Sequence, residues 1–265
     1  MIIAQISDTH IFRDAPDADL RASDLERTIA DINALEPAVD VLIHTGDMAH
    51  GGRCEDYALA ASLLRQSHAP VYVAPGNRDD RENLRQAFSP WACRASGGEF
   101  LDYAIDEFPV RLMAVDTVSP GTNKGDFSEE HARRLIELID AETTKPIVAF
   151  MHHPPYIVSV GPDPLNFVTF EAMARLQRTL QHSERVIAVL CGHVHRSTGG
   201  RIGEIPVMVV PCTATPLRKG DYPPQMRDRP VYHLHRFDPA NGLCTEARIV
   251  GGAAADAEGR QRRSA

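Results

Sequence analysis

Five short clusters in the chain carry side chains of the kinds that bind divalent metal ions in proteins. They are Asp8-Thr9-His10, Gly46-Asp47, Gly76-Asn77, His152-His153 and Gly192-His193-Val194-His195. Carboxylate, amide oxygen and imidazole together suit Mn, Fe, Co or Zn, whereas Ca or Mg would ask for nearly all oxygen. The residue types therefore predict a transition-metal site, and its candidate ligands are Asp8, His10, Asp47, Asn77, His152, His193 and His195.

These candidate ligands are too many for one tetrahedral ion. They divide well between two ions about 3.5–4 Å apart if one carboxylate bridges the pair, and Asp47 is the candidate bridge. We therefore predict two divalent metal ions per chain. The ligand types leave Mn²⁺, Fe²⁺ or Fe³⁺, Zn²⁺ and Co²⁺ open, because affinity follows metal availability as much as geometry.

Each cluster closely follows a short apolar run that is typical of a buried β-strand. The runs cover residues 2–6, 39–44, 71–74, 147–151 and 186–190. Loops at the carboxyl ends of neighbouring strands converge in space, so residues scattered over most of the chain can line one pocket. The sequence therefore predicts a single site at one end of the strands.

Helical patterns alternate with strands in the first half of the chain, and hairpin-like strands dominate its end. The predicted helices cover 20–35, 55–65, 81–88, 128–139 and 170–181, the fourth with Ser128 as its N-cap. Further strands are predicted over 101–105, 110–115, 205–210, 231–237 and 246–250. The segments 154–167 and 211–230 look irregular, and we expect them to shape access to the site or a dimer contact.

In type and order, these clusters resemble the pattern of the calcineurin-like metallophosphoesterase family, which reads Asp-x-His, Gly-Asp, Gly-Asn-His-Asp/Glu, His and Gly-His-x-His. The resemblance covers roughly residues 1–212. It implies a four-layer αββα sandwich, an α/β (α+β) fold class. It also implies a first metal held by Asp8, His10, Asp47 and His195, and a second held by Asp47, Asn77, His152 and His193.

Within this family the chain is most similar to bacterial phosphodiesterases that act on cyclic nucleotides and glycerophosphodiesters. The segments that carry this likeness are Ile6-Ser7-Asp8-Thr9-His10, Glu55-Asp56-Tyr57, Gly121-Thr122-Asn123-Lys124-Gly125 and Met151-His152-His153-Pro154-Pro155. The implied reaction is hydrolysis of a small phosphodiester, such as 3′,5′- or 2′,3′-cyclic AMP, by direct attack of a metal-bound hydroxide. A phosphomonoesterase and a non-catalytic scaffold of the same fold stay open as alternatives.

Arg78 departs from the family pattern, because it stands where the family has a histidine after the asparagine ligand. That histidine is credited with protonating the leaving group or steadying the phosphoryl oxygens. The guanidinium of arginine stays charged, so it can donate two hydrogen bonds to a phosphate but cannot transfer a proton to the leaving group. We interpret Arg78 as a phosphate clamp. The alternative is that it turns away and pairs with Asp79 or Asp80 at the surface.

Other residues around the clusters are candidates for lesser roles. Asn77, Arg78, His195 and His50 are candidate substrate contacts, and His153 is a candidate orienting residue behind the ligands. His233 and His235 share a His-x-His spacing, but no apolar run followed by glycine accompanies them, so we expect no metal role.

Length and charge suggest an enzyme with a small substrate. The chain has 265 residues and a formal net charge of −8, which disfavours a nucleic-acid partner because a basic face supplies most of that affinity. No apolar stretch approaches the roughly 20 residues that span a bilayer, so no membrane partner is expected. Met1 leads directly into a strand, which indicates a cytoplasmic protein.

One domain over residues 1–250 is expected, and its β-rich part 211–250 is a candidate for capping or for dimerisation into a homo-oligomer. The small, polar tail 251–265 is expected to be disordered. The five cysteines are odd in number and widely spaced, which predicts buried free thiols.

Overall fold

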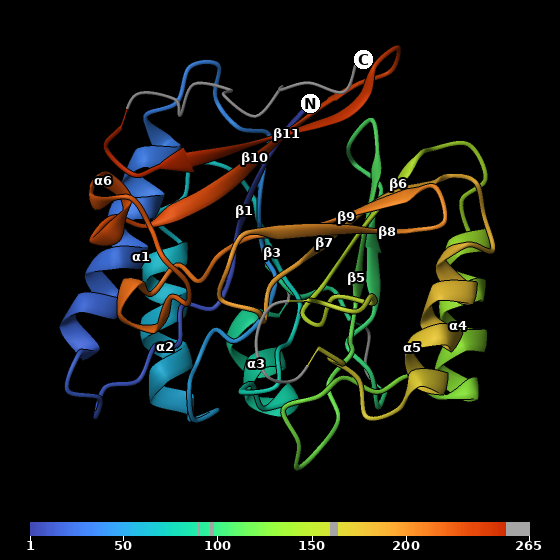
Figure 1. Cartoon of the computed structure of the whole chain (residues 1–265), viewed down its shortest axis with the longest axis horizontal. Coiled ribbons are helices and arrows are strands. Elements are labelled where there is room, and N and C mark those ends of the chain that lie inside the picture. Colours follow the sequence, from blue (N-terminus) through green and yellow to red (C-terminus); the bar gives the residue numbers. More distant parts are fainter. Residues whose placement is uncertain (90, 96–97, 160–163, 253–265) are drawn as a thin grey trace.

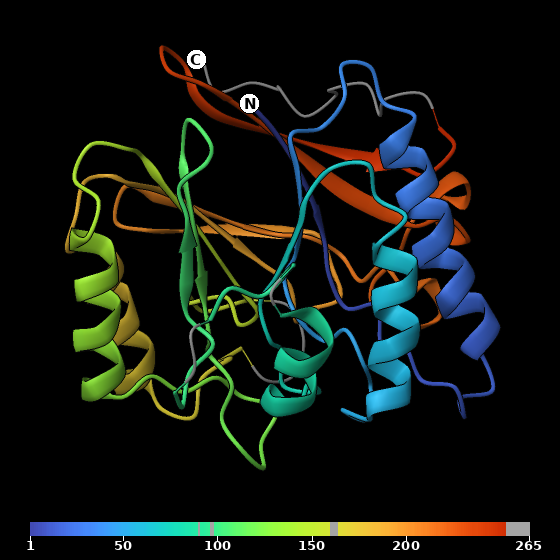
Figure 2. The same cartoon turned by 180° about the vertical axis from the view of Figure 1, so that it is seen from behind.

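Two mixed β-sheets pack face to face between two groups of helices in the computed structural model (Figure 1). The structure describes residues 1–89, 91–95, 98–159 and 164–252, so most of the predicted tail lies outside the described residues. Figure 2 shows the same layers from behind, with one pair of long helices on each side of the sheets. The predicted αββα sandwich is therefore confirmed.

The first sheet has the strand order β11-β10-β1-β2-β3. Its strands are β1 (Ile2–Ile6), β2 (Val41–His44), β3 (Val71–Val73), β10 (Val231–Asp238) and β11 (Gly242–Ile249). The first three are parallel, and β10 and β11 join antiparallel beside β1. The segment 211–250 thus adds two strands to this sheet, while its role in capping or dimerisation stays a prediction.

The second sheet has the order β4-β5-β6-β7-β9-β8. Its strands are β4 (Tyr103–Ile105), β5 (Arg111–Val115), β6 (Ile147–Met151), β7 (Val186–Cys191), β8 (Thr198–Ile202) and β9 (Ile205–Val209). The four inner strands are parallel and the two edge strands are antiparallel. The sequence did not predict β8, because Gly199 and Gly200 interrupt any apolar pattern there.

The helices cover the outer faces of the two sheets (Figure 1). They are α1 (Ala18–Asn33), α2 (Cys54–Leu64) and α3 (Arg81–Phe88) on the first sheet, and α4 (Glu129–Asp140) and α5 (Phe170–Leu180) on the second. A further short helix, α6 (Pro224–Arg227), lies in the segment predicted to be irregular. Ser128 caps α4 as predicted, because its hydroxyl accepts a hydrogen bond from His131 N at 3.1 Å. None of the helices in the described part of the chain has the length and apolar character that crossing a membrane requires.

Alternating side chains on β6 explain why the sheet is buried on both faces. Val148 and Phe150 belong to the core shared by both sheets, whereas Ile147, Ala149 and Met151 pack with residues of α4 and α5. A strand with apolar side chains on both faces reads as a continuous apolar run. This is why the sequence pattern located the central strands correctly.

A polar network crosses the core and fixes the two sheets relative to each other. Gln5 Nε2 donates to Cys191 O at 2.9 Å, and its Oε1 lies 3.0 Å from His235 Nε2. His235 Nδ1 also lies 2.8 Å from Thr245 Oγ1. His235 is therefore part of this hydrogen-bond network. The network also holds the carboxyl ends of β1 and β7 side by side, and metal-binding residue types follow both ends.

All five cysteines are free, as predicted, but two of them are exposed. Cys93, Cys191 and Cys212 are buried, whereas Cys54 and Cys244 face solvent. The prediction of buried thiols is wrong for the exposed pair, because Cys54 opens α2 at the surface and Cys244 lies on the edge strand β11.

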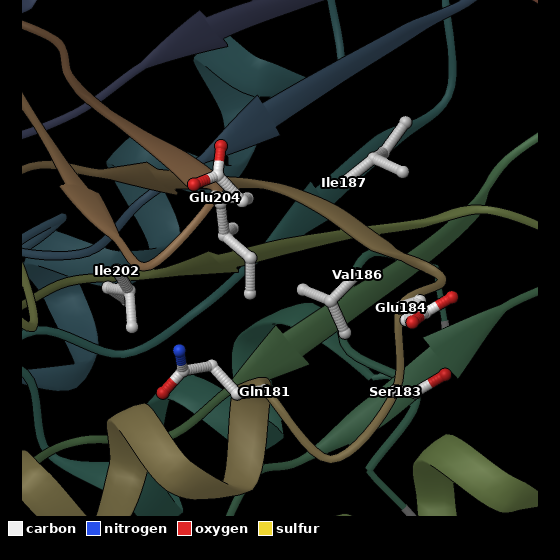
Figure 3. Close-up of a pocket in the computed structure, with 8 residues that line it drawn as sticks. Gln181, Ser183, Glu184, Val186, Ile187, Ile202 and Glu204 are labelled. Carbon is white, nitrogen blue, oxygen red and sulfur yellow. The ribbon is translucent and has the colours of Figure 1, made fainter.

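A cavity of about 530 Å³ lies at the amino end of β7 (Figure 3). Figure 3 shows Gln181, Val186 and Ile202 around it, from the end of α5, the start of β7 and the end of β8. The predicted metal ligands follow the carboxyl ends of the strands. The length of β7 therefore separates this cavity from them.

Candidate metal centre

The loops that follow β1 and β2 run side by side and bring the first two clusters together. Asp8 N donates to Gly46 O at 2.9 Å, and His10 N donates to Asp47 O at 2.9 Å. Their strands are parallel neighbours, so the carboxylates of Asp8 and Asp47 come from the same end of the sheet. Backbone pairing thus positions these side chains.

The backbone is strained at five of the seven predicted ligands. Their φ angles are positive, at 56° for Asp8, 45° for His10, 54° for Asp47, 71° for His193 and 59° for His195. Such a conformation costs an L-residue roughly 1–2 kcal/mol, and strain of this kind clusters at functional sites. Among the described residues other than glycine, only these five have a positive φ.

A first group of donor atoms gathers around His10 and His195. Their Nε2 atoms lie 3.0 Å apart, and Asp8 Oδ1 lies 3.1 Å from His195 Nε2. Asp47 Oδ2 lies 3.7 Å from His10 Nε2. Two imidazole nitrogens and two carboxylate oxygens at these separations can converge on one ion.

A second group gathers around His152. Its Nε2 atom lies 3.1 Å from Asn77 Oδ1 and 3.5 Å from Asp47 Oδ1. His193 Nδ1 lies 3.0 Å from the same Asn77 oxygen. Asp47 thus directs one oxygen toward each group, which is the geometry that a bridging carboxylate requires.

Hydrogen bonds to backbone carbonyls determine which ring nitrogen of His152 and of His195 faces the donor groups. His195 Nδ1 donates to Leu217 O at 2.8 Å, and His152 Nδ1 donates to Thr45 O at 2.8 Å. A carbonyl oxygen can only accept, so both rings carry the proton on Nδ1. Each Nε2 then presents its lone pair to the donor group when the ring is neutral.

The electrostatics of the two groups keep the carboxylates ionised. Burial opposes their charge, but His195 and His10 hold the pKa of Asp8 well below its ordinary value. Against the same effect of burial, His152 lowers the pKa of Asp47 to about 2. Burial lowers the pKa of both His152 and His195. Against it, Asp47 and Asp8 raise the pKa of His152 to about 9, and Asp8 and Cys212 raise that of His195 to about 11.

One carboxylate oxygen shows that the donor set fits a cation. Asp8 Oδ2 accepts from His193 N at 3.0 Å, whereas buried Asp8 Oδ1 accepts no well-aligned hydrogen bond and faces the Nε2 atoms of His195 at 3.1 Å and His10 at 3.7 Å. A buried carboxylate oxygen needs a positive charge close to it, either on an imidazolium or on a metal ion. The residues present therefore fit a divalent metal at this position.

Two glycines in the clusters lie so close to neighbouring side chains that no larger residue would fit. A Cβ at Gly76 would lie 2.3 Å from Asp47 Oδ1, and a Cβ at Gly192 would lie 1.9 Å from Ser7 Oγ. These positions let the loops after β3 and β7 come against the loops after β2 and β1. The glycines that precede Asn77 and His193 are therefore part of the site's architecture.

Replacing Gly192 with alanine is expected to destabilise the protein by about 1–3 kcal/mol, because the added methyl group has no space beside Ser7. A melting curve should show a fall in Tm of about 2–12 °C. Gly51→Ala is the matched control, since the nearest atom to its Cβ would lie 3.6 Å away. A Gly192→Ala variant as stable as that control would contradict the steric argument.

The remaining predicted site residues lie around the same groups. His153 is buried, its Nδ1 lies 2.8 Å from Thr117 Oγ1, and it packs beside His152 and His193. His50 Nδ1 lies 3.2 Å from His10 Nδ1, so it contacts a candidate ligand directly. Their roles toward a metal or substrate stay predictions.

Arg78 is exposed at the edge of the groups, and its backbone N donates to Asp47 Oδ1 at 2.7 Å. Within the described part of the chain it forms no ion pair with Asp79 or Asp80. Asp79 is buried and accepts from Gly76 N and Tyr57 OH, and Asp80 caps α3 through Asn83 N. The surface pairing considered for Arg78 is therefore absent from this structure.

Two acidic residues support the site in a role that the sequence analysis did not predict for them. Asp79 accepts from Met48 N and Gly76 N, so it ties together the loops that carry Asp47 and Asn77. Asp24, buried on α1, accepts from both Thr215 N (2.8 Å) and Thr215 Oγ1 (2.7 Å). For Asp24, the available signal was an aspartate on the apolar face of a predicted helix.

Asp24 positions His195 through a short 3₁₀ helix, η1 (Thr215–Leu217), whose last carbonyl accepts from that histidine. Replacing Asp24 with alanine is expected to weaken metal binding by about 10–100-fold, because loss of a residue that orients a metal ligand typically has an effect of this size. Equilibrium titration with Mn²⁺ measures this, with Asp19→Asn on the exposed side of α1 as control. Equal affinities in the two variants would show that η1 holds its place without Asp24.

The family comparison agrees with this geometry. The model of the calcineurin-like phosphoesterase family matches residues 1–197. The chain belongs to the calcineurin-like phosphoesterase family. The matched residues include every predicted ligand of both donor groups. The family resemblance seen in the sequence is therefore confirmed.

Curated relatives of this phosphoesterase cover most of its length. A probable glycerophosphodiester phosphodiesterase from Arcobacter nitrofigilis is 31% identical over 260 residues, covering 95% of this chain and 94% of the relative. A 3′,5′-cyclic adenosine monophosphate phosphodiesterase from Pseudomonas aeruginosa is 25% identical, covering 83% and 79%. The chain is thus similar to phosphodiesterases along nearly its whole length.

Solved structures support the fold of this phosphoesterase. A dimetal phosphatase from Danio rerio superposes with a TM-score of 0.68 at 13% identity, covering 94% of this chain and 95% of that chain. A purple acid phosphatase from yellow lupin also gives 0.68, at 14% identity, and covers 96% and 52%. At such identities the likeness shows the fold alone.

Proposed function

We propose that this phosphoesterase hydrolyses small phosphodiesters with two divalent metal ions. The observation that carries the proposal is the arrangement of Asp47, whose two oxygens face separate donor groups. The first group would be completed by Asp8, His10 and His195, and the second by Asn77, His152 and His193. This division agrees with the one implied by the family resemblance.

Ions bound there would lower the pKa of a water molecule and offset charge on the phosphoryl oxygens. Asp8 and Asp47 hold the positions as ionised carboxylates, and the carbonyls of Leu217 and Thr45 keep two imidazoles oriented toward them. The chain needs no nucleophile of its own for this chemistry.

Arg78 would bind a non-bridging phosphate oxygen from the edge of the site. Burial lowers the pKa of His50, and the charges of His10 and then Arg78 lower it further. A guanidinium group can donate two hydrogen bonds to the phosphate but cannot protonate the leaving group. We therefore expect preference for leaving groups that need little protonation, or protonation by water.

The substrate class in this proposal is a small diester, either a cyclic nucleotide or a glycerophosphodiester. Both classes are supported by the relatives, which include a probable glycerophosphodiester phosphodiesterase and a 3′,5′-cyclic adenosine monophosphate phosphodiesterase. The net charge of −8 opposes an extended nucleic-acid partner, whereas two divalent ions would make the pocket locally positive.

Hydrolysis of a matched panel tests the function. The panel contains bis-p-nitrophenyl phosphate, p-nitrophenyl phosphate, 3′,5′- and 2′,3′-cyclic AMP and glycerophosphoethanolamine, each with added Mn²⁺ and with chelator. The proposal expects metal-dependent turnover of diesters above the monoester. Preference for the monoester would make the protein a phosphatase, and no turnover with metal bound would favour a scaffold.

A further inference from the structure

His50 is held beside His10 by the backbone and by an aromatic neighbour. Its backbone N donates to Ile11 O at 3.0 Å, and Ile11 pairs with Ala49 in a parallel bridge. The Phe12 ring packs against the His50 ring, with 5.6 Å between the two centroids. The His50 ring is therefore fixed next to the His10 ring, and their centroids lie 5.3 Å apart.

A hydrogen bond joins the two imidazoles at their Nδ1 atoms, which lie 3.2 Å apart. The other nitrogen of His10, Nε2, faces the first donor group, 3.0 Å from His195 Nε2 and 3.7 Å from Asp47 Oδ2. One of the two Nδ1 atoms must carry the proton, and the other must accept it. His10 can offer the lone pair of Nε2 to an ion only if its own proton is on Nδ1.

The partner of His10 differs in kind from the partners of His152 and His195. In those two rings Nδ1 donates to a backbone carbonyl, which can only accept. His50 can either donate or accept at Nδ1, so its tautomer decides whether His10 Nε2 is free to bind an ion. In the form that leaves His10 Nε2 free, His50 accepts at Nδ1 and carries its own proton on Nε2.

We propose that His50 is a positioning residue for the first ion, because it accepts the Nδ1 proton of His10 and keeps His10 Nε2 directed at that ion. The inference rests on the proposed function and deepens it, because it assigns to the metal centre a residue that the sequence suggested as a substrate contact. Outer partners of this kind fix the tautomer and the ring orientation of metal-binding histidines. Loss of the hydrogen bond should therefore weaken the first ion and leave the second ion bound at His152 and His193.

Nitrogen NMR of protein labelled with ¹⁵N-histidine tests the tautomer directly. With Zn²⁺ bound, His50 should carry its proton on Nε2 and have an unprotonated Nδ1, whereas His10 should carry its proton on Nδ1. The signals that disappear in His50→Leu identify His50. A proton on Nδ1 of His50 in the Zn²⁺-loaded protein would overturn the proposal.

Zn²⁺ titration of matched variants tests the effect on the ion, and the NMR signals of His10 and His152 follow the two ions separately. His50→Leu removes the acceptor and should weaken the first ion by about 10–100-fold, with the second ion unchanged. His50→Asn should recover most of the affinity, because its side-chain oxygen can accept near the position of Nδ1. His68→Leu, at an exposed position before β3, is the control and should bind both ions as the wild-type protein does.

Three results of this titration would overturn the proposal. The first is an unchanged affinity for the first ion in His50→Leu. The second is an equal loss at both ions, which is what a purely structural role would produce. The third is a His50→Asn variant that binds the first ion no better than His50→Leu does.

The substrate panel separates this inference from the proposed function. Metal-dependent diester hydrolysis by a protein whose His50 is protonated on Nδ1 would reject the role of His50 alone. The expected tautomer and the selective loss of the first ion, without hydrolysis of any substrate, would reject the proposed function and leave His50 as a positioning residue of a metal site.

Discussion

Replacing Asp47 with alanine is expected to lower kcat/KM for bis-p-nitrophenyl phosphate by at least about a thousandfold. The two Asp47 oxygens face both donor groups, so one substitution removes a ligand from each. Loss of a single electrostatic contact to a transition state already costs about 10²–10³ in rate. Initial rates with saturating Mn²⁺, together with the metal content of the dialysed protein, measure the effect.

The control for this prediction is Asp14→Ala, because Asp14 is an acid on the surface that pairs with Arg53 away from the donor groups. Its rate and metal content should match those of the wild-type protein. An Asp47→Ala variant that retained two tightly bound ions would contradict the bridging role. Retained metal with lost activity would instead assign Asp47 a role in the reaction beyond holding the ions.

Replacing Arg78 with alanine is expected to lower kcat/KM by about 10–100-fold while metal content stays unchanged. A hydrogen bond to a charged partner contributes about 1.5–3 kcal/mol. Arg78 is exposed, and among the described residues it forms no ion pair with Asp79 or Asp80. Arg78→Lys should recover only part of the rate, because lysine keeps the charge but lacks the planar fork. Arg133→Ala, on the exposed face of α4, is the control.

A second comparison uses the family's usual histidine at this position. Arg78→His should restore a group that can protonate the leaving oxygen, so diesters with more basic leaving groups should gain most relative to the wild-type protein. Rates for a series of leaving groups measure this. The interpretation of Arg78 would fail if the dependence of rate on leaving group were the same in both proteins.

The sequence by itself determined the residue types at the site and the elements that carry them. Apolar runs before Asp8, Asp47 and His152 predicted buried strands, and these strands are present as β1, β2 and β6. Local patterning suffices for this, because burial on both faces demands continuous apolar residues. The order of the ligand types along the chain also predicted the family, which the comparison confirmed.

Only the tertiary structure decided how the ligands divide between two groups. Spacing along the chain places Asp8 and His195 far apart, and it is the order of strands in two sheets that brings their atoms to 3.1 Å. Sequence patterns specify where strands end but not which strands are neighbours. The strand β8 was also missed, because its glycines remove the pattern that marks a strand.

The supporting contacts of the site were equally beyond the sequence. Leu217 orients His195 with a backbone carbonyl, a group that every residue carries, so no residue type could mark it. The segment after β9 runs against the end of β1 through the hydrogen bond from Thr213 N to Ser7 O, and no local pattern marks that contact. Residue types determine which chemistry is available, whereas the packing of distant segments decides which atoms meet.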